Sequence, residues 1–349
     1  MLTSRPFGSL PTGEAVEIHT LANSAGASMT VITYGGIVTS LRVPDRDGRL
    51  ADVVLGFDTL AAYLNGHPYF GAITGRVAGR LSSGRFTVGG AVHQLALNDG
   101  AHHLHGGIAG LDKRLWRATP APRADNAPSL RLTYRSPDGE EAYPGNVDFS
   151  VTYTLTEDNA FVIETQAVAD RPTPVNPTHH SYFNLSGEST GSIAGHELQI
   201  HADNFVPADD ELIQLGRLDP VASPGNDFRQ PRCLGDALPE LFKRHGDLYR
   251  VRRQAGAART LVPIARFAEP RSGRVLAVST NEDYLQLYTG CSLDGTLVGK
   301  SGRAYGPHSG LCLECQGYPG AVNTPAMGDI LVRPGEPQNR VTVYSFSTY

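Results

Sequence analysis

Residues 176–185 read N-P-T-H-H-S-Y-F-N-L, and the prediction of the fold starts from them. Pro177 biases the residue before it toward an extended backbone, and the residues after it favour a pleated strand. Neighbouring side chains on a strand point to opposite faces. We therefore expect His180, Tyr182 and Asn184 to share a polar face, with His179, Ser181 and Phe183 on the other.

The composition indicates a globular chain rich in turns. The chain has 349 residues, of which 40% are hydrophobic and 19% are charged. Its 39 glycines and 24 prolines make roughly 18% of the chain against a usual ~12%, without a periodic repeat. Many turns with abundant Val, Thr and Tyr are typical of many short strands. Because all-β architectures often exceed about 200 residues as one unit, we expect residues 1–349 to form a single domain.

Charge, cysteine content and hydropathy argue against several classes of protein. The net charge is −5 with no basic block, so we expect no nucleic-acid partner. The four cysteines, Cys233, Cys291, Cys312 and Cys315, are too few for a disulfide framework. Residues 1–10 lack the pattern of a signal peptide, and the chain has no apolar run of about 18 residues. We therefore expect a cytoplasmic protein with reduced thiols and no membrane partner.

Alternation of apolar and polar residues predicts strands along most of the chain. We expect two strands in 28–41, a hairpin at 86–97 with its turn at Gly89 and Gly90, and three strands in 130–168. Further single strands are expected at 198–205, 275–288, 309–316 and 339–346, and short helices at 58–64 and 236–244. The predicted class is all-β, a large antiparallel β-sandwich of many short strands with few short helices.

An acidic residue within an apolar strand is the clearest candidate for chemistry. Residues 309–316 read S-G-L-C-L-E-C-Q, and alternation places Cys312, Glu314 and Gln316 on one face. A buried glutamate is rare unless it is paired or functional. Cys312 and Cys315 point to opposite faces, so we interpret the C-x-x-C sequence as core and not as a redox pair.

Two other segments carry polar or aromatic side chains whose role the pattern leaves open. Tyr284, Gln286 and Tyr288 share a strand face that fits either core packing or the wall of a sugar pocket. The loop at 98–107, N-D-G-A-H-H-L-H-G-G, contains His103-x-His105, which resembles the start of a cupin metal site. The glutamate of such a site is missing at 109–110, so we expect no metal, although a zinc site built from distant residues stays open.

Several motifs in a fixed order resemble one family. Residues 176–185 resemble N-x-T-N-H-[ST]-Y-F-N-L, the signature of the aldose 1-epimerases (galactose mutarotases). Further resemblances are G-R-V-A-G-R-L at 75–81, L-H-G-G at 104–107, G-L-D-K-R-L-W at 110–116, S-P-D-G-E-E-A-Y-P-G-N-V at 136–147, F-V-P-A-D-D-E-L-I at 205–213 and L-E-C-Q-G-Y-P-G-A-V-N at 313–323. Their number and order make the resemblance specific, and the family fold is a large β-sandwich.

The resemblance implies an enzyme that interconverts the α and β anomers of free aldohexoses such as galactose and glucose. It implies His180 as general acid and Glu314 as general base, with no cofactor, a monosaccharide as the partner, and a monomer or homodimer. The implied sugar contacts are Arg80, His105, Tyr182, Asp247 and Gln286, of which Asp247 lies in a poorly matched run, H-G-D-L-Y. If Arg80 lies close to Glu314, it helps to keep that carboxyl ionised.

Three positions depart from the family pattern. Gly79 replaces the asparagine before Arg80 and removes a side-chain contact to the sugar. His179 replaces the asparagine before His180, and on a strand it points away from that residue. Gly320 replaces an aspartate in a turn, where we expect little effect.

Three other functions stay open. A non-catalytic sugar-binding domain on the same scaffold would lack the acid or the base. A phosphosugar 1-epimerase would need additional cationic side chains at the pocket, for which Arg76, Arg80 and Arg85 are candidates. A metal-dependent β-sandwich enzyme would reveal its metal by elemental analysis of the purified protein.

Overall fold

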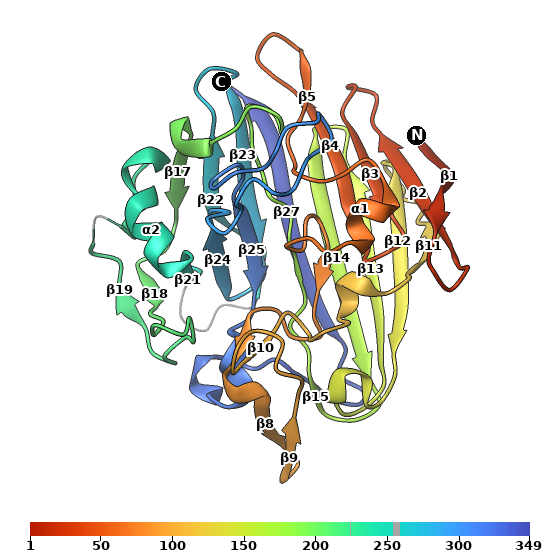
Figure 1. Ribbon diagram of the computed structural model, residues 1–349, viewed down its shortest axis with the longest axis vertical. Helices are drawn as coiled ribbons and strands as arrows, with labels where there is room; N and C mark the ends of the chain where they lie inside the picture. Colours follow the sequence, from red (N-terminus) through yellow and green to blue (C-terminus); the bar gives the residue numbers. More distant parts are fainter. Residues whose placement is uncertain (224, 254–258) are drawn as a thin grey trace.

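Strands form most of the regular structure of the protein (Figure 1). The computed structural model describes residues 1–223, 225–253 and 259–349. Within these ranges the two α-helices are short, α1 (Leu60–Leu64) and α2 (Leu238–Arg244), and both lie where the sequence predicted helix. None of the helices in the described ranges has the length and apolar character needed to cross a membrane. The predicted all-β class is therefore confirmed.

Three larger antiparallel sheets contain most of the described strands. The first has the order β1 (Leu2–Ser9), β2 (Ala15–Ala22), β3 (Ser28–Ile32), β4 (Val38–Pro44), β5 (Leu50–Asp52). The nine-stranded sheet has the order β11 (Arg117–Pro120), β12 (Ser129–Ser136), β13 (Val147–Leu155), β14 (Ala160–Ala169), β27 (Gln338–Thr348), β23 (Arg274–Thr280), β22 (Val262–Ala268), β17 (Glu197–Ile200), β20 (Arg232–Cys233). The third, called here the site sheet, has the order β19 (Asp219–Pro220), β18 (Asn204–Val206), β21 (Asp247–Arg250), β24 (Tyr284–Tyr288), β25 (Cys312–Gln316).

Four two-stranded ladders accompany these sheets in the described part of the chain. They are β7 (Arg80–Leu81) with β10 (His103–Leu104), β6 (Ile73–Thr74) with β16 (Thr178–His179), β15 (Thr173–Pro174) with β26 (Leu331–Val332), and β8 (Arg85–Val88) with β9 (Ala91–Gln94). The β8–β9 ladder is the predicted hairpin with its turn at Gly89 and Gly90, and it projects at the bottom of Figure 1. The three predicted strands in 130–168 correspond to β12, β13 and β14.

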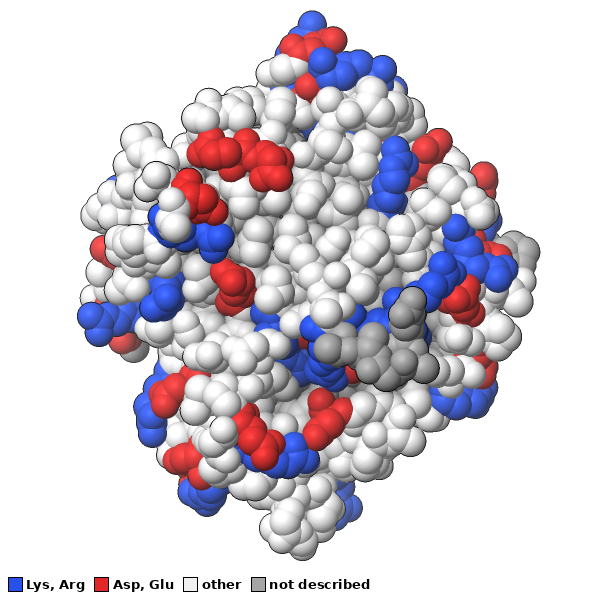
Figure 2. Space-filling model, turned by 180° about the vertical axis from the view of Figure 1, so that it is seen from behind, with Lys and Arg blue, Asp and Glu red and all other residues white. Residues whose placement is uncertain are grey.

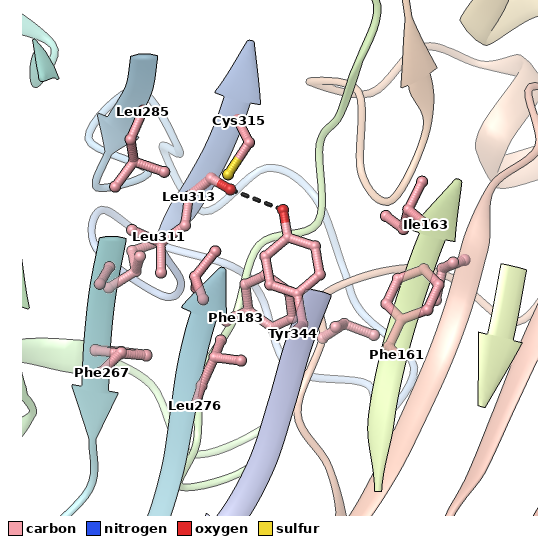
Figure 3. Packing of buried hydrophobic residues seen from close by; sticks show 14 of the residues in the cluster. Phe161, Ile163, Phe183, Phe267, Leu276, Leu285, Leu311, Leu313, Cys315 and Tyr344 are labelled. Atoms are coloured by element: carbon pink, nitrogen blue, oxygen red, sulfur yellow. Dashed lines mark hydrogen bonds between the residues drawn. The ribbon is translucent and has the colours of Figure 1, made fainter. Parts of the chain in front are cut away.

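The main core lies between the nine-stranded sheet and the strands that carry the site. Alternate residues of β13 are buried, as expected for a sheet with one covered face. Phe161 and Tyr344 of the nine-stranded sheet point toward Leu313 and Cys315 of β25 (Figure 3). The Tyr344 hydroxyl donates a hydrogen bond of 2.8 Å to the carbonyl oxygen of Leu313. This bond joins the nine-stranded sheet to the strand that carries Glu314.

Two segments predicted as continuous strands are divided between two sheets. Residues 198–205 form the end of β17 in the nine-stranded sheet and the start of β18 in the site sheet. Residues 275–288 likewise divide into β23 and β24. At these points the chain passes from one sheet to the other. The alternation of buried and exposed residues is the same before and after the crossing, because both sheets bury one face against the same core. The alternation therefore located the buried residues but missed the crossings.

The stretch 176–185 is extended, but only Thr178 and His179 form a strand, β16. Phe183 makes isolated bridges to Val54 and Leu311 instead. The segment thus passes from one ladder to another, and the predicted continuous strand is wrong. His179 and His180 nevertheless point to opposite sides, as predicted.

Asn184 does not share the polar surroundings of His180, contrary to the prediction. Its side-chain amide donates hydrogen bonds to the carbonyl oxygens of Gly191 and Ser309, at 2.8 and 2.9 Å. The side chain therefore holds two loops in place and does not face a ligand.

Acidic and basic side chains are scattered in small mixed groups over the face shown in Figure 2, whose centre is mostly uncharged. All four cysteines are free, and Cys312 and Cys315 are buried on opposite sides of β25. The interpretation of C-x-x-C as core is confirmed.

We expect Tyr344→Phe to lower the free energy of unfolding by about 1–3 kcal/mol, because it removes the donor to a buried carbonyl group. Urea denaturation followed by far-UV circular dichroism measures the change. Tyr349→Phe is the matched control, since Tyr349 is 56% exposed. Equal stability of Tyr344→Phe and the unmodified protein would show that the bond between the sheets contributes nothing.

Candidate active site

A pocket of about 840 Å³ lies between the site sheet and the loops around β7 and β10. This volume is within the range of roughly 300–1,000 Å³ usual for small-molecule sites. The structure brings all the residues of the predicted site to this pocket, namely Arg80, His105, His180, Tyr182, Asp247, Gln286 and Glu314. Tyr288 also lines it, whereas Tyr284 points into the core and its hydroxyl donates to the carbonyl oxygen of Met327.

The pair His180 and Glu314 lies on one wall of the pocket. Glu314 is at the centre of β25, and His180 follows β16. Among the contacts that hold these segments together, the Thr178 hydroxyl donates to the Cys315 carbonyl at 2.9 Å, and Phe183 forms a backbone bridge to Leu311. His180 Nε2 thereby lies 3.6 Å from Glu314 Oε1, with both side chains nearly fully buried. No other hydrogen-bond or ion-pair partner of the Glu314 carboxyl is present among the described residues.

The imidazole of His180 is fixed by rings on both sides. Tyr182 stacks on it with ring centroids 5.2 Å apart, and Tyr69 lies at 5.7 Å. His105 meets it edge-on at 5.2 Å. The Cys312 sulfur lies 3.5 Å from Nδ1, so Nε2 is the nitrogen directed at Glu314. A ring held in this way needs little reorganisation to exchange a proton at Nε2.

Burial moves the two pKa values of the pair in opposite directions. Loss of solvent lowers the pKa of His180 to about 4. It also raises the pKa of Glu314 to about 8, although the positive charge of Arg80 acts in the opposite direction. Arg80 therefore lowers the pKa of Glu314 as predicted, but its effect is smaller than that of burial, and it does not keep the carboxyl ionised. At neutral pH the pair therefore holds one proton, and burial favours the uncharged arrangement with that proton on Glu314.

His105 has its tautomer set by the backbone. Its Nδ1 accepts a hydrogen bond of 3.2 Å from the Gly79 amide, so the neutral ring carries its proton on Nε2. Burial and the neighbouring His180 hold the pKa of His105 well below its ordinary value. A neutral imidazole with its Nε2–H in the pocket is suited to donate a hydrogen bond to a ligand hydroxyl group.

Three side chains of this pocket could together hold a metal ion. Ligand atoms of His105, His180 and Glu314 all lie within 4.8 Å of one another. The Gly79 amide occupies the lone pair of His105 Nδ1, and Nε2 of the neutral ring carries a proton. His105 would therefore have to exchange its tautomer and lose this hydrogen bond before it could bind a metal. The donor set fits a metal poorly for this reason.

Several residues of the pocket were missed by the sequence analysis. They are Tyr69, Asp99, His245 and Gln316, together with the loop formed by 205–212. The side-chain oxygen of Gln316 is buried and has no hydrogen-bond partner within residues 1–223, 225–253 and 259–349, so it can accept from a ligand hydroxyl. The alternation of β25 placed Gln316 on the face of Glu314 and could have found it. Nothing in the sequence around Tyr69 or His245 indicated a site, because their position at the pocket depends on how distant segments of the chain pack together.

The departures from the family pattern have different surroundings. Gly79 has φ +76°, and a Cβ there would lie 2.5 Å from Cγ of Pro319, so a side chain would require Pro319 to move. His179 faces the core, where its Nε2 is 2.7 Å from the Ser181 hydroxyl, and a cavity of about 30 Å³ adjoins it. Gly320 lies in a short 3₁₀-helix (Pro319–Val322) beside the ring of Tyr318.

The fold is an antiparallel β-sandwich with a buried His–Glu pair in the wall of a pocket, an arrangement suited to acid–base chemistry, and comparisons with known proteins are more specific. A family model described as aldose 1-epimerase matches residues 17–345. The galactose mutarotase of Sus scrofa is 43% identical over 350 residues, with 99% of this chain and 98% of that protein covered. The aldose 1-epimerase of Escherichia coli (strain K12) is 32% identical, with 96% of both chains covered. The crystal structure of galactose 1-epimerase from Lactobacillus acidophilus NCFM has a TM-score of 0.86 at 28% identity and covers 100% of this chain and 99% of that chain.

The chain belongs to the aldose 1-epimerase family, a family of isomerases. The resemblance found in the ordered motifs is confirmed, and so is the predicted mutarotase-like sandwich.

We expect kcat/KM for anomerisation to be flat at neutral pH and to fall on both sides. Above a pH of about 8 Glu314 loses the proton and the pair contains no acid. Below a pH of about 4 His180 is also protonated and the pair contains no base. Polarimetry, corrected for the spontaneous rate at each pH, measures the profile. Arg80→Gln should move the alkaline limb to higher pH, because Arg80 lowers the pKa of Glu314; an unmoved limb would contradict this assignment.

Proposed function

We propose that the protein interconverts the α and β anomers of free aldohexoses such as galactose and glucose, with His180 and Glu314 as the acid–base pair. The observation that supports this most strongly is the 3.6 Å separation of His180 Nε2 and Glu314 Oε1 in a buried wall. Anomerisation requires a proton to leave the C1 hydroxyl and another to reach the ring oxygen. Because both oxygens are bonded to C1, the two catalytic groups must lie close together.

In the proposed reaction, Glu314 takes the proton of the C1 hydroxyl while His180 donates one to the ring oxygen. The ring opens to the aldehyde, the C1–C2 bond turns by roughly half a revolution, and the ring closes on the other face. On closure Glu314 gives its proton to the aldehyde oxygen and His180 takes one back from the hydroxyl that becomes the ring oxygen, so each group acts once as acid and once as base. General acid–base catalysis of this kind typically contributes about 10²–10⁴-fold, and fixed positions add more.

The resting proton must move before this reaction starts. Burial places it on Glu314, whereas the proposed roles require an imidazolium and a carboxylate. Sugar hydroxyl groups that donate to Glu314 stabilise the carboxylate, and Arg80 acts in the same direction. The proton then passes to His180 across the short gap between them. Both arrangements contain one proton, so they share the same pH profile.

The proposed sugar contacts surround this pair. Arg80 and His105 supply donors, Asp247 supplies a carboxylate, and Gln286 faces Glu314 across the β24–β25 ladder. Tyr182 forms an apolar surface beside His180. The chain itself provides every group that this reaction uses, so we propose that it needs no cofactor. We further propose a monosaccharide as its partner and a cytoplasmic monomer or homodimer as its state. The free cysteines agree with a reducing compartment.

A phosphosugar substrate is less consistent with the site. Of the three arginines considered, only Arg80 lines the pocket. Arg76 is buried against Ser136 and Tyr143, and Arg85 is exposed on β8. Arg80 is itself paired with Asp99 at 2.6 Å. A non-catalytic sugar-binding domain is also disfavoured, because both groups of the acid–base pair are present and face each other.

We expect Glu314→Gln to lower kcat for galactose anomerisation by about 10²–10⁴-fold while galactose still binds, because glutamine keeps the shape but cannot exchange the proton. Polarimetry of freshly dissolved α-galactose and α-glucose gives the rates, and isothermal titration calorimetry gives the affinity. Glu188→Gln is the matched control, since Glu188 is a buried glutamate that does not line the pocket.

A rate like that of the unmodified protein in Glu314→Gln would refute the role of the glutamate. Binding without anomerisation by the unmodified protein would support the non-catalytic alternative instead.

A further inference from the structure

The pocket has an unusual balance of charge. Among its described lining residues Arg80 is the single lysine or arginine. Six carboxyl groups line it as well, from Asp99, Asp209, Asp210, Asp219, Asp247 and Glu314. In a partly enclosed pocket such groups act on a bound charge through little solvent, so their field is stronger than on an open surface.

Arg80, the one lysine or arginine among the described lining residues, is neutralised by a specific partner. Arg80 Nε donates to Asp99 Oδ2 at 2.6 Å, and both side chains are only partly exposed, 21% for Arg80 and 36% for Asp99. A pair with this degree of exposure is screened only in part by solvent. The guanidinium can still donate to a hydroxyl group through its terminal nitrogens, but its charge is balanced by Asp99.

The loop that carries Asp99 is held in one arrangement. The backbone amide of Asp99 donates to His102 O, and the amide of His102 donates to Asp99 O, at 3.1 and 3.0 Å. The Asn98 side chain closes the loop by accepting from the Leu104 amide and donating to Leu104 O. Leu104 lies in β10, which pairs with the strand of Arg80. The backbone therefore directs the Asp99 carboxylate at Arg80 before any ligand binds.

We propose that Asp99 is a specificity-determining residue that, through its pair with Arg80, makes the pocket select neutral aldoses over aldoses that carry a negative charge. The excluded class comprises uronic acids and sugar phosphates. Among the described lining residues, an anionic group finds no lysine or arginine free to balance it and faces several carboxylates. Removal of the Asp99 charge leaves Arg80 uncompensated and available to such a group. This proposal rests on the proposed anomerisation of free aldoses.

A purely structural role of Asp99 makes a different prediction. If Asp99 only positions Arg80, its loss should slow all sugars by the same factor. A comparison of two substrates of the same shape and different charge separates the two roles, because a common loss cancels in their ratio. Galacturonate and galacturonamide form such a pair.

The experiment measures kcat/KM for anomerisation of galacturonate and galacturonamide at neutral pH, where the uronate is ionised. It uses the unmodified protein, Asp99→Asn and Asp210→Asn. Asparagine keeps the shape of Asp99 and its hydrogen bond to Arg80 but removes the charge. Asp210→Asn is the matched control, because it removes the same charge from the same pocket at an exposed side chain, and within the described part of the chain that side chain forms no ion pair with Arg80.

We expect kcat/KM of the unmodified protein to be about tenfold or more higher for galacturonamide than for galacturonate, because the pocket carboxylates repel the negative charge of the uronate. Asp99→Asn should raise the ratio of uronate to amide by about tenfold, and Asp210→Asn by less than about threefold, since solvent screens its charge.

Three outcomes would overturn the proposal: equal kcat/KM for uronate and amide in the unmodified protein, an unchanged ratio in Asp99→Asn, or an equal rise in Asp210→Asn. Galactose serves as the reference substrate throughout. Failure of the unmodified protein to anomerise galactose would refute the proposed function itself, which keeps the two failures distinct.

Discussion

The contact between β25 and the segment 176–185 is the constraint on which the active site depends. Glu314 and His180 belong to segments far apart in the chain, and neither segment alone places a proton acceptor beside a donor. Thr178 and Phe183 join these segments by a side-chain hydrogen bond and a backbone bridge. Tyr344 fixes β25 from behind by its bond to Leu313 (Figure 3). The separation within the acid–base pair is therefore set by the packing of the sandwich.

Burial of this pair has an energetic cost and a chemical use. Two ionisable groups taken out of water both favour their uncharged forms, which lowers the pKa of His180 and raises that of Glu314. The two values thereby fall on opposite sides of neutrality, and the pair holds a single proton over a wide range of pH. The proposed reaction removes one proton from the C1 hydroxyl and delivers one to the ring oxygen, and a pair that holds a single proton can do both. An unpaired charge on either group would be costly at this depth, and the stability of the surrounding core compensates for the burial of the two groups.

Some polar residues around the pair hold another side chain in place, and others present hydrogen-bonding groups to the pocket. The Gly79 amide sets the tautomer of His105, and the absence of a side chain at Gly79 agrees with the close approach of Pro319. Asp99 directs and neutralises Arg80. Gln316 presents a buried oxygen that has no hydrogen-bond partner among the described residues. The pocket of this aldose 1-epimerase therefore offers many hydrogen-bonding groups and little net positive charge, which suits a neutral polyhydroxyl ligand.

The sequence by itself determined the all-β class and the core faces of most strands, and it singled out His180 and Glu314 as the proposed acid–base pair. Alternation of side chains is a local property, and it placed Glu314 on a polar face of an apolar strand and His179 opposite His180. The ordered motifs then supplied the family. The crossings between sheets within 198–205 and 275–288, the arrival of Tyr69 and His245 at the pocket, and the pairing of Arg80 with Asp99 were decided only by the tertiary structure. The protonation of the pair was decided there too, because desolvation depends on which distant segments cover a group, and no local pattern of residues records that.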